Sequence, residues 1–303
     1  MTAIASAIVA LTALGQGIEP EHAANPIYRA LRAQGVKLDG IAVTFPAPLF
    51  VDGQDAAAER KALRGVAGSA AKANELLRDS VTAPMVLKVR DIRGDGDSGT
   101  IVRAADLWFV VHADLATIDL DRLAGLSARA EPVEVGNMRF ESKTLTADQV
   151  KAQGIEPMKA GDAAREWFVH VAAILLDRVQ VEATDRVMAT KSADSIVVAS
   201  RTAPEFKPDG PFPTRWRKLF RNRDGKNTAP GPSQPYSGGA GYVKVSRSAD
   251  KHGALLVEAH FVFDEPRAWF GGAPTLRSKI GLVAQDRIRR LRRELADRAA
   301  QGK

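Results

Sequence analysis

The 303-residue sequence contains no cysteine. Disulfide bonds, thiolate metal sites and cysteine nucleophiles are therefore excluded together. The motifs G-x-S-x-G and H-E-x-x-H, which mark many serine hydrolases and zinc proteases, are also missing. Aromatic residues make up only 6% of the chain, and no apolar run is long enough to predict a transmembrane helix. The sequence thus predicts no metal site and no cofactor.

Apolar residues account for 45% of the chain, which is enough for a buried core in one large domain or two ordinary ones. The net charge of +7 is concentrated in two segments. Residues 276–303 carry a net +6 and residues 201–226 a net +5, so the rest of the chain is acidic. Such local basicity favours a surface that contacts phosphates, anionic lipid or an acidic partner, while a solvated helix face is the simpler alternative.

Residues 1–16 form an apolar run about as long as the hydrophobic region of a secretory signal. No Lys or Arg precedes this run, whereas an ordinary signal sequence begins with basic residues. We interpret residues 1–17 as a degenerate signal sequence and expect an exported, periplasmic protein. A buried N-terminal helix in a cytoplasmic protein is the alternative.

The remaining chain divides into a helical part and a strand-rich part. Residues 18–80 are mainly helix-like. In residues 81–303, β-branched and aromatic residues alternate with polar ones and predict antiparallel strand pairs, with turns at residues 94–99 and 249–253. Proline- and glycine-rich residues 204–239 predict a long loop. We expect residues 81–303 to form one domain, which can include residues 18–80.

The clearest predicted element is a C-terminal helix of about residues 275–299. Its apolar residues recur at helical spacing along one stripe, and charged residues cover the other faces. Strand pairs precede this helix and no βαβ series occurs, so the sequence predicts an α+β fold in which an antiparallel sheet packs against the long amphipathic helix. The stripe comprises Leu276, Ile280, Val283, Ala284, Ile288, Leu291 and Leu295.

The order of elements from about residue 165 to residue 300 resembles that of START-like helix-grip domains. In that fold a curved sheet closes over a long C-terminal helix and leaves a lipid-sized cavity. The resemblance implies a binding site for an amphipathic molecule between the sheet and the helix. It rests on element order, which other domains built of a sheet and a helix share.

The chain contains the stretches ANPIYR at residues 24–29, YSGGAGY at 236–242, FDEP and WF within 263–270, and LRSK and QD within 276–286. These stretches resemble an uncharacterised family of exported planctomycete proteins. The resemblance implies export, and the family has no known activity to transfer. This chain departs from the family because it lacks the basic start of an ordinary signal sequence.

Residues 94–99 match the dinucleotide-binding pattern G-x-G-x-x-G. Dinucleotide binding requires this loop between a strand and a helix, whereas a second strand follows here, so we predict a hairpin turn instead. Asp91, Asp95 and Asp97 could contribute oxygens to a calcium ion, but the closing glutamate of a calcium loop is missing.

Two S-x-x-K matches begin at Ser69 and Ser248, without the companion motifs of penicillin-recognising enzymes. The five histidines are scattered, and no two have the spacing of metal ligands on a helix. We therefore assign no catalytic residue and no metal ligand, and we regard an enzyme as the less favoured class.

Lys244, Glu258 and His260 are predicted to share one face of two neighbouring strands. Glu258 and His260 are two residues apart, so their side chains lie on the same side of a strand, and Lys244 can lie on the adjacent strand. If this face lines a cavity, the three side chains could orient a ligand or exchange protons. We prefer a solvent-facing position, because the apolar residues at 257, 259, 261 and 263 form the better core face.

Trp269 and Phe270 precede the basic helix and are followed by two glycines. Together with Arg277, such a pair could insert at a membrane surface or contact a ligand. An aromatic pair in this position more often attaches the start of a helix to its sheet, and we prefer that interpretation.

Three function classes remain open. We favour a non-catalytic envelope or periplasmic domain that binds an amphipathic small molecule or an anionic lipid. The first alternative is a nucleic-acid-binding protein that uses the basic residues 201–226 and 276–303. The second is a hydrolase whose acid and base, such as Glu258 and His260, come from the sheet. The oligomeric state is not predicted.

Overall fold

A computed structural model describes residues 22–94, 100–121, 132–158, 163–221, 228–271, 273 and 275–301. The predicted signal sequence, residues 1–17, lies outside these ranges. Most of the G-x-G-x-x-G match, with Asp95 and Asp97 of the calcium alternative, lies outside them as well.

Antiparallel strands form one large sheet. Its strands follow the order β3–β4–β14–β13–β9–β8–β7–β6–β5, and each adjacent pair is antiparallel. The hairpins predicted at residues 94–99 and 249–253 are the pairs β3–β4 and β13–β14. The strands are β3 (Val86–Ile92), β4 (Thr100–His112), β5 (Val133–Val135), β6 (Met138–Thr144), β7 (Ala164–Leu175), β8 (Val179–Lys191), β9 (Ser195–Thr202), β13 (Gly239–Arg247) and β14 (Ala254–Pro266).

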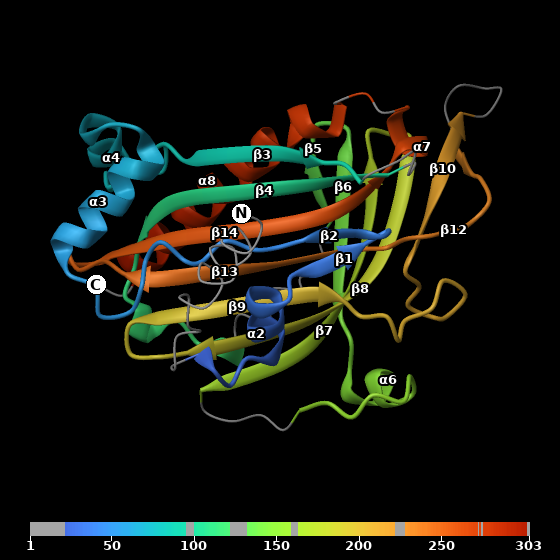
Figure 1. The fold of residues 1–303 in the computed structure, drawn as a ribbon, viewed down its shortest axis with the longest axis horizontal. Helices are drawn as coiled ribbons and strands as arrows, with labels where there is room; N and C mark the ends of the chain where they lie inside the picture. Colours follow the sequence, from blue (N-terminus) through green and yellow to red (C-terminus); the bar gives the residue numbers. More distant parts are fainter. Residues whose placement is uncertain are drawn as a thin grey trace, which may run out of the picture.

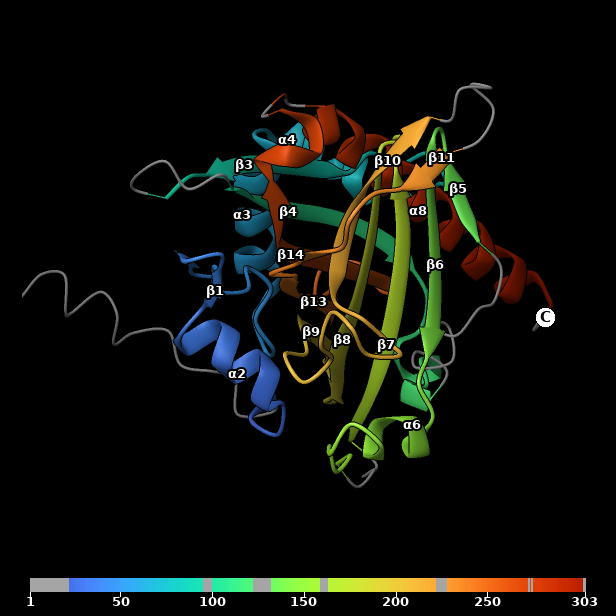
Figure 2. The same cartoon turned by 90° about the vertical axis from the view of Figure 1, so that its right-hand side faces the viewer.

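The sheet divides at β8. Residues 185–191 of this strand pair with β9, whereas residues 179–182 pair with β10 (Arg215–Arg221). Two short strands, β11 (Thr228–Pro230) and β12 (Gln234–Pro235), pair with β10 in turn. The sheet curls strongly, so that β6 and β7 run across the direction of β3 and β4 (Figure 2).

The prediction of a long loop at residues 204–239 is therefore wrong. This stretch contains β10, β11 and β12. Its prolines and glycines indicate turns, but they do not exclude a strand between them, and the sequence RWRKLFR of β10 has too few apolar residues to reveal it. The partner of β10 is the free edge of β8, which local sequence cannot identify.

One long helix covers one face of the sheet, called the inner face below. The short α7 (Arg267–Phe270) follows β14 directly, and α8 (Thr275–Gln301) then runs back across the sheet. In Figure 1, α8 lies behind the strands β3, β4 and β14, while α2 lies in front of the sheet. The predicted α+β fold, with an antiparallel sheet packed against a long C-terminal helix, is confirmed.

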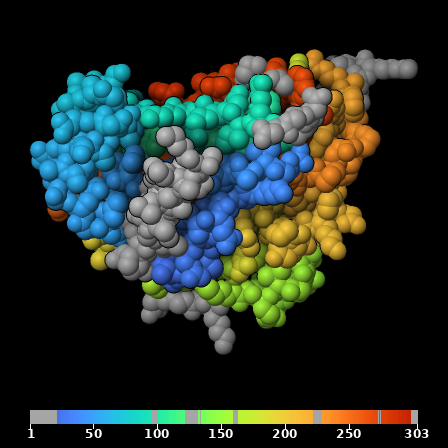
Figure 3. Space-filling model, viewed as in Figure 1, coloured from blue at the N-terminus to red at the C-terminus, as the bar shows by residue number. Residues whose placement is uncertain are grey.

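Residues 22–52 cover the opposite, outer face of the sheet, as the blue segment in Figure 3 shows. They form α2 (Pro26–Ala33) and the hairpin of β1 (Val36–Leu38) and β2 (Ile41–Val43). Asn25 caps α2 by accepting a hydrogen bond from the Tyr28 N–H, and its amide donates to the Met188 carbonyl at 3.0 Å. The apolar side of α2 packs on the sheet residues Val102, Met188, Val197, Tyr242 and Val262.

Two further helices pack at one end of the sheet. α3 (Ala56–Ala67) ends at Gly68, whose φ of 82° is the left-handed conformation that glycine favours, and α4 (Ala70–Leu76) follows. The two helices are therefore separated at Gly68 and Ser69. Between β6 and β7, the short α6 (Ala147–Lys151) begins with a capping box formed by Thr146 and Gln149.

Arg292 fastens α8 to the edge of the sheet. Its buried guanidinium donates hydrogen bonds to the carbonyl oxygens of Val110 at 3.0 Å, Pro84 at 3.3 Å and Ala83. Burial lowers the pKa of Arg292. At least one of the basic residues of the helix is therefore used within the fold and is not available to a partner.

Candidate functional site

A cavity of about 560 Å³ lies between α8 and the inner face of the sheet. Strands β3, β4, β6, β7, β8, β13 and β14 contribute its floor, and α8 contributes its roof. The side chains that line it are almost all apolar, and the volume falls within the range typical of small-molecule sites.

The floor of the cavity follows from strand alternation in β14. Val257, Ala259, Phe261 and Phe263 point to the inner face, as the sequence predicts for its core face. Phe261 nevertheless remains 39% exposed, although it belongs to a central strand beneath a helix. A side chain in this position is exposed only because the space above it is unfilled.

Two glycines of β13 make room for these aromatic rings. Gly241 pairs with Phe261 and Gly239 pairs with Phe263. A Cβ atom at Gly241 would lie 2.7 Å from the ring of Phe261, and one at Gly239 would lie 3.2 Å from the Cβ of Phe263. Any larger residue would push the phenylalanines into the cavity or distort the strand.

The roof of the cavity is the apolar stripe predicted for α8. Leu276 and Ile288 are buried against the sheet, but Ile280, Val283 and Ala284 between them are only half-buried. These three residues face the cavity rather than the floor of the sheet. The helix therefore spans the cavity, and its two buried stripe residues, Leu276 and Ile288, lie on either side of the half-buried ones.

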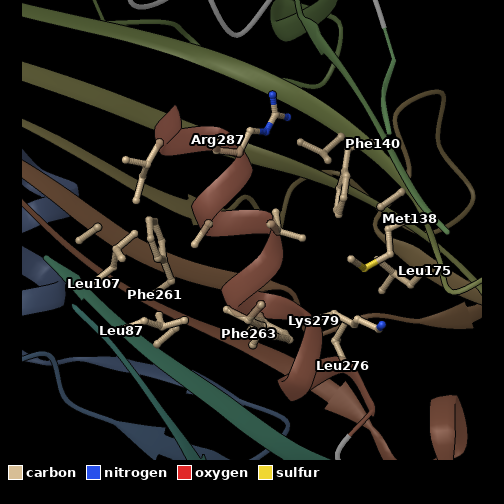
Figure 4. A pocket seen from close by; sticks show the side chains of 18 of the residues that line it. Leu87, Leu107, Met138, Phe140, Leu175, Phe261, Phe263, Leu276, Lys279 and Arg287 are labelled. Atoms are coloured by element: carbon tan, nitrogen blue, oxygen red, sulfur yellow. The ribbon is translucent and has the colours of Figure 1, made fainter. Parts of the chain in front are cut away.

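Lys279 and Arg287 are the cationic residues that line the cavity. Both extend from α8 on the side of Phe140 and Leu175 (Figure 4). Burial, followed by the neighbouring charge of Arg290, lowers the pKa of Arg287. An apolar cavity with cations at its margin is suited to a molecule that has a hydrocarbon body and an anionic group.

Trp269 and Phe270 are buried at one end of the cavity, as preferred from the sequence. Trp269 lines the cavity, and its ring centroid lies 5.6 Å from that of Tyr236 and 6.1 Å from that of Trp216. The aromatic pair thus attaches the segment before α8 to the sheet. It does not form an exposed surface for insertion into a membrane.

Arg277 is exposed and takes part in an ionic network beside the start of α8. Its guanidinium lies 3.4 Å from a carboxylate oxygen of Asp91. The buried Arg103 joins the same Asp91 at 2.6 Å and Glu265 at 2.7 Å. Arg277 therefore connects the helix to β3 and does not line the cavity.

The structure brings Lys244, Glu258 and His260 together, but on the outer face and away from the cavity. Lys244 and Glu258 are cross-strand partners, and all three residues are at most 1% exposed. The preference for a solvent-facing position is therefore wrong. Residues 45–52 lie over this face, and the sequence offers no local indication of a cover that is some 200 positions away.

The buried polar side chains hold the covering segment in place. Glu258 accepts hydrogen bonds from the backbone N–H groups of Leu49 at 2.9 Å and Phe50 at 3.2 Å. Lys244 lies 2.8 Å from Asp52. These contacts give the buried charged groups their partners and hold residues 45–52 over the outer face. The role of Lys244 and Glu258 is therefore structural.

His260 joins two carboxylates in the same layer. Its Nδ1 lies 2.8 Å from Asp106, and its Nε2 lies 3.5 Å from Glu258. Burial opposes protonation of the imidazole, but the hydrogen bond to Asp106 and the nearby carboxylate of Glu258 outweigh this effect, and the pKa of His260 is raised. Because the group is buried, no substrate can reach it without displacement of residues 45–52.

A second buried histidine also fails to form a catalytic arrangement. His22 Nε2 lies 2.7 Å from the Ser195 hydroxyl, and that hydroxyl donates a hydrogen bond to Asp52 at 2.8 Å. In a catalytic triad the carboxylate orients the histidine, whereas here it binds the serine. His22 and Ser195 are fully buried, so the group anchors the start of the described chain.

Asp264 is a buried carboxylate near the end of β14. It is 3% exposed, and its Oδ1 has no hydrogen-bond partner among the described residues. Burial and the nearby charge of Asp39 raise the pKa of Asp264 to about 6. The folded protein therefore carries an energetic cost for ionising this group at neutral pH.

We expect Asp264→Asn to raise the free energy of unfolding at pH 8 by about 1–3 kcal/mol. The unfolded carboxyl group has a pKa near 3.8, so the folded protein loses stability as the pH rises from about 4 to 6. The asparagine avoids this cost at high pH and gives no advantage at about pH 3.5. Urea unfolding at both pH values measures the difference, with the exposed Asp209→Asn as control. An equal gain at both pH values would contradict the assignment.

Comparisons with known proteins add no family to this picture. The chain matches no protein-family model, and a search of curated proteins also found no match. In the described part of the chain, no three His, Asp or Glu side chains are grouped in a way that could hold a metal ion. No described helix combines the length and the apolar character that crossing a membrane requires.

Sequence reasoning missed Lys279 and Arg287. Both belong to the basic segment 276–303, and they flank the apolar stripe of the helix eight positions apart. Residues three, four or eight positions apart lie on similar sides of a helix, so their nearness to the stripe could have been found from the sequence. The sequence could not show that Lys279 and Arg287 line a cavity, because the cavity depends on the curl of the sheet.

Proposed function

We propose that this protein is a non-catalytic binding protein for an amphipathic small molecule with an anionic group. The cavity of about 560 Å³ beneath α8 is the observation that supports the proposal. Its apolar lining favours a hydrocarbon body, and Lys279 and Arg287 favour a carboxylate or phosphate. The START-like character and the exported, periplasmic localisation remain part of this proposal.

Burial of hydrocarbon would supply most of the affinity. Each square ångström of apolar surface removed from water contributes about 25 cal/mol, and each buried methylene group about 0.8 kcal/mol. Phe261 and the half-buried residues of α8 would lose their contact with water at the same time. The cations would then select for charge rather than supply the main binding energy.

The two alternatives draw less support from the geometry. Glu258 and His260 do not line the cavity, so a hydrolase would lack an acid and a base beside its substrate. In the basic stretches, Arg215 pairs with Glu182, Arg277 pairs with Asp91, and Arg292 is buried. A nucleic-acid site would have to rely on the other basic residues of these stretches.

The proposal predicts that dansyl-labelled undecanoic acid binds to the protein with one-to-one stoichiometry and a rise in dansyl fluorescence. Ala284→Phe should weaken this binding at least about tenfold, equivalent to about 1.4 kcal/mol, because the ring enters the cavity from its roof. The fold should be preserved, since alanine to phenylalanine fills space that is empty. Fluorescence titration and thermal unfolding measure the two effects.

Leu282→Phe is the matched control. Leu282 lies on the same helix, but it is 52% exposed and does not line the cavity. Its replacement should leave the affinity unchanged. Absence of binding to the wild-type protein, or equal affinities for the wild type and Ala284→Phe, would refute the proposed function.

A further inference from the structure

A second hollow of about 480 Å³ adjoins the aromatic end of the cavity. The turn between β7 and β8 and the outer part of β10 form its walls. Leu176 and Asp177 in this turn both have positive φ values, as in the tight hairpin turns that match the twist of two strands. The turn places Arg178 opposite the residues of β10, and the Arg178 carbonyl accepts the Leu219 N–H at 2.7 Å.

Three cationic side chains line this hollow: Arg178, Lys218 and Arg221. All three are exposed, and none of them makes a salt bridge within the described part of the chain. Asp177 is the one acidic residue of the lining. The lining therefore carries three positive charges and one negative charge, and none of its three cations is paired in a salt bridge among the described residues.

Trp269 lies between the hollow and the apolar cavity. It lines both, and its side chain is buried between them. The indole N–H has no hydrogen-bond partner among the described residues. Because Trp269 borders both spaces, the aromatic end of the apolar cavity lies beside the three cations of the hollow.

We propose that this hollow binds a phosphate-type head group whose hydrocarbon chain occupies the cavity beneath α8. The inference rests on the proposed function and specifies the class of ligand as a single-chain phospholipid. A phosphate monoester carries nearly two negative charges at neutral pH, and arginine guanidinium groups match its oxygens. Three cations suit such a group better than the single charge of a fatty acid.

The test compares oleoyl lysophosphatidic acid with monoolein, its neutral counterpart, both below the micelle concentration. Calorimetry or tryptophan fluorescence of the full chain measures the affinities. The wild type should bind the phosphate ligand at least about tenfold more tightly than monoolein. The variant Arg178→Gln, Lys218→Gln, Arg221→Gln should lose this preference and keep its affinity for monoolein.

The matched control carries Lys61→Gln, Lys72→Gln and Arg78→Gln. These exposed residues lie on or just after α3 and α4, at the opposite end of the molecule from β10 (Figure 1). The control should retain the preference. Glycerol phosphate, which has no long chain, should bind weakly to the wild type, so tight binding of glycerol phosphate would indicate a site for free phosphate compounds and overturn the proposal.

The remaining outcomes separate the inference from the proposed function. If neither long-chain ligand binds, both fail. If both ligands bind equally, or if the triple variant keeps the preference, the head-group site is refuted while the proposed function stands. If Lys279→Gln alone abolishes the preference, the head group lies beneath α8 and not in the hollow, which also overturns the inference.

Discussion

Replacing Glu258 by alanine is expected to lower the free energy of unfolding by about 4 kcal/mol. The substitution leaves the Leu49 and Phe50 amides without their acceptor and removes a carboxylate that stabilises protonated His260. The covering segment, residues 45–52, would lose its attachment at its centre. Chemical unfolding monitored by circular dichroism measures the effect, and a variant too unstable to purify would agree with it.

Glu258→Gln separates the two contributions. The amide oxygen keeps one acceptor for the backbone of the covering segment, but the negative charge is gone. We expect this variant to lose less stability than the alanine variant, and most of its loss should appear at low pH, where His260 is charged. The raised pKa of His260 contributes stability below the ordinary value of 6.5, and this contribution disappears as the pH rises through the folded value. A loss below about 1 kcal/mol in Glu258→Ala would show that the polar layer is not important for stability.

Replacing Arg292 by alanine should have the second largest effect, a loss of about 3 kcal/mol. The guanidinium donates to the carbonyl oxygens of Val110, Ala83 and Pro84, which would lose this donor in a buried space. The C-terminal half of α8 would separate from the sheet. Thermal unfolding measures the loss of stability, and hydrogen exchange of the helix measures the local detachment.

Arg293→Ala supplies the control because Arg293 is the next residue of α8 and is exposed. It changes the net charge by the same amount and should leave the stability nearly unaltered. Arg292→Lys should recover part of the loss, since lysine can reach one carbonyl oxygen but cannot serve several at once. Equal effects at positions 292 and 293 would show that charge, and not the carbonyl contacts, is responsible.

Much of the fold could be predicted from local pattern. The strand at residues 254–263 and the C-terminal helix could be assigned from their periodicity, and so could the side of the helix that faces the sheet. β10 could not be assigned in the same way. It is a short segment rich in basic residues, and its position depends on a partner strand, β8, that lies more than 30 positions earlier.

The candidate site was predictable only in outline. A space between the sheet and the helix follows from the order of elements. The polar residues Lys244, Glu258 and His260 share one strand face, and in the folded protein this face is buried. Polar residues at alternate strand positions usually indicate a sheet face that is exposed to solvent. Here residues 45–52 cover that face instead. Lys218 and Arg221 belong to a basic stretch visible in the sequence, whereas Arg178 joins them only through the pairing of β8 with β10.

The exposure of Phe261 has a consequence for the energetics of the unliganded protein. A folded chain normally gains most of its stability by withdrawing aromatic and aliphatic groups from water, but here part of that gain is left unrealised on the inner face. A ligand in the cavity would bury this apolar surface and supply the missing stabilisation. The apparent free energy of unfolding would then rise with the logarithm of the ligand concentration. For this protein, resistance to unfolding would report how full the cavity is.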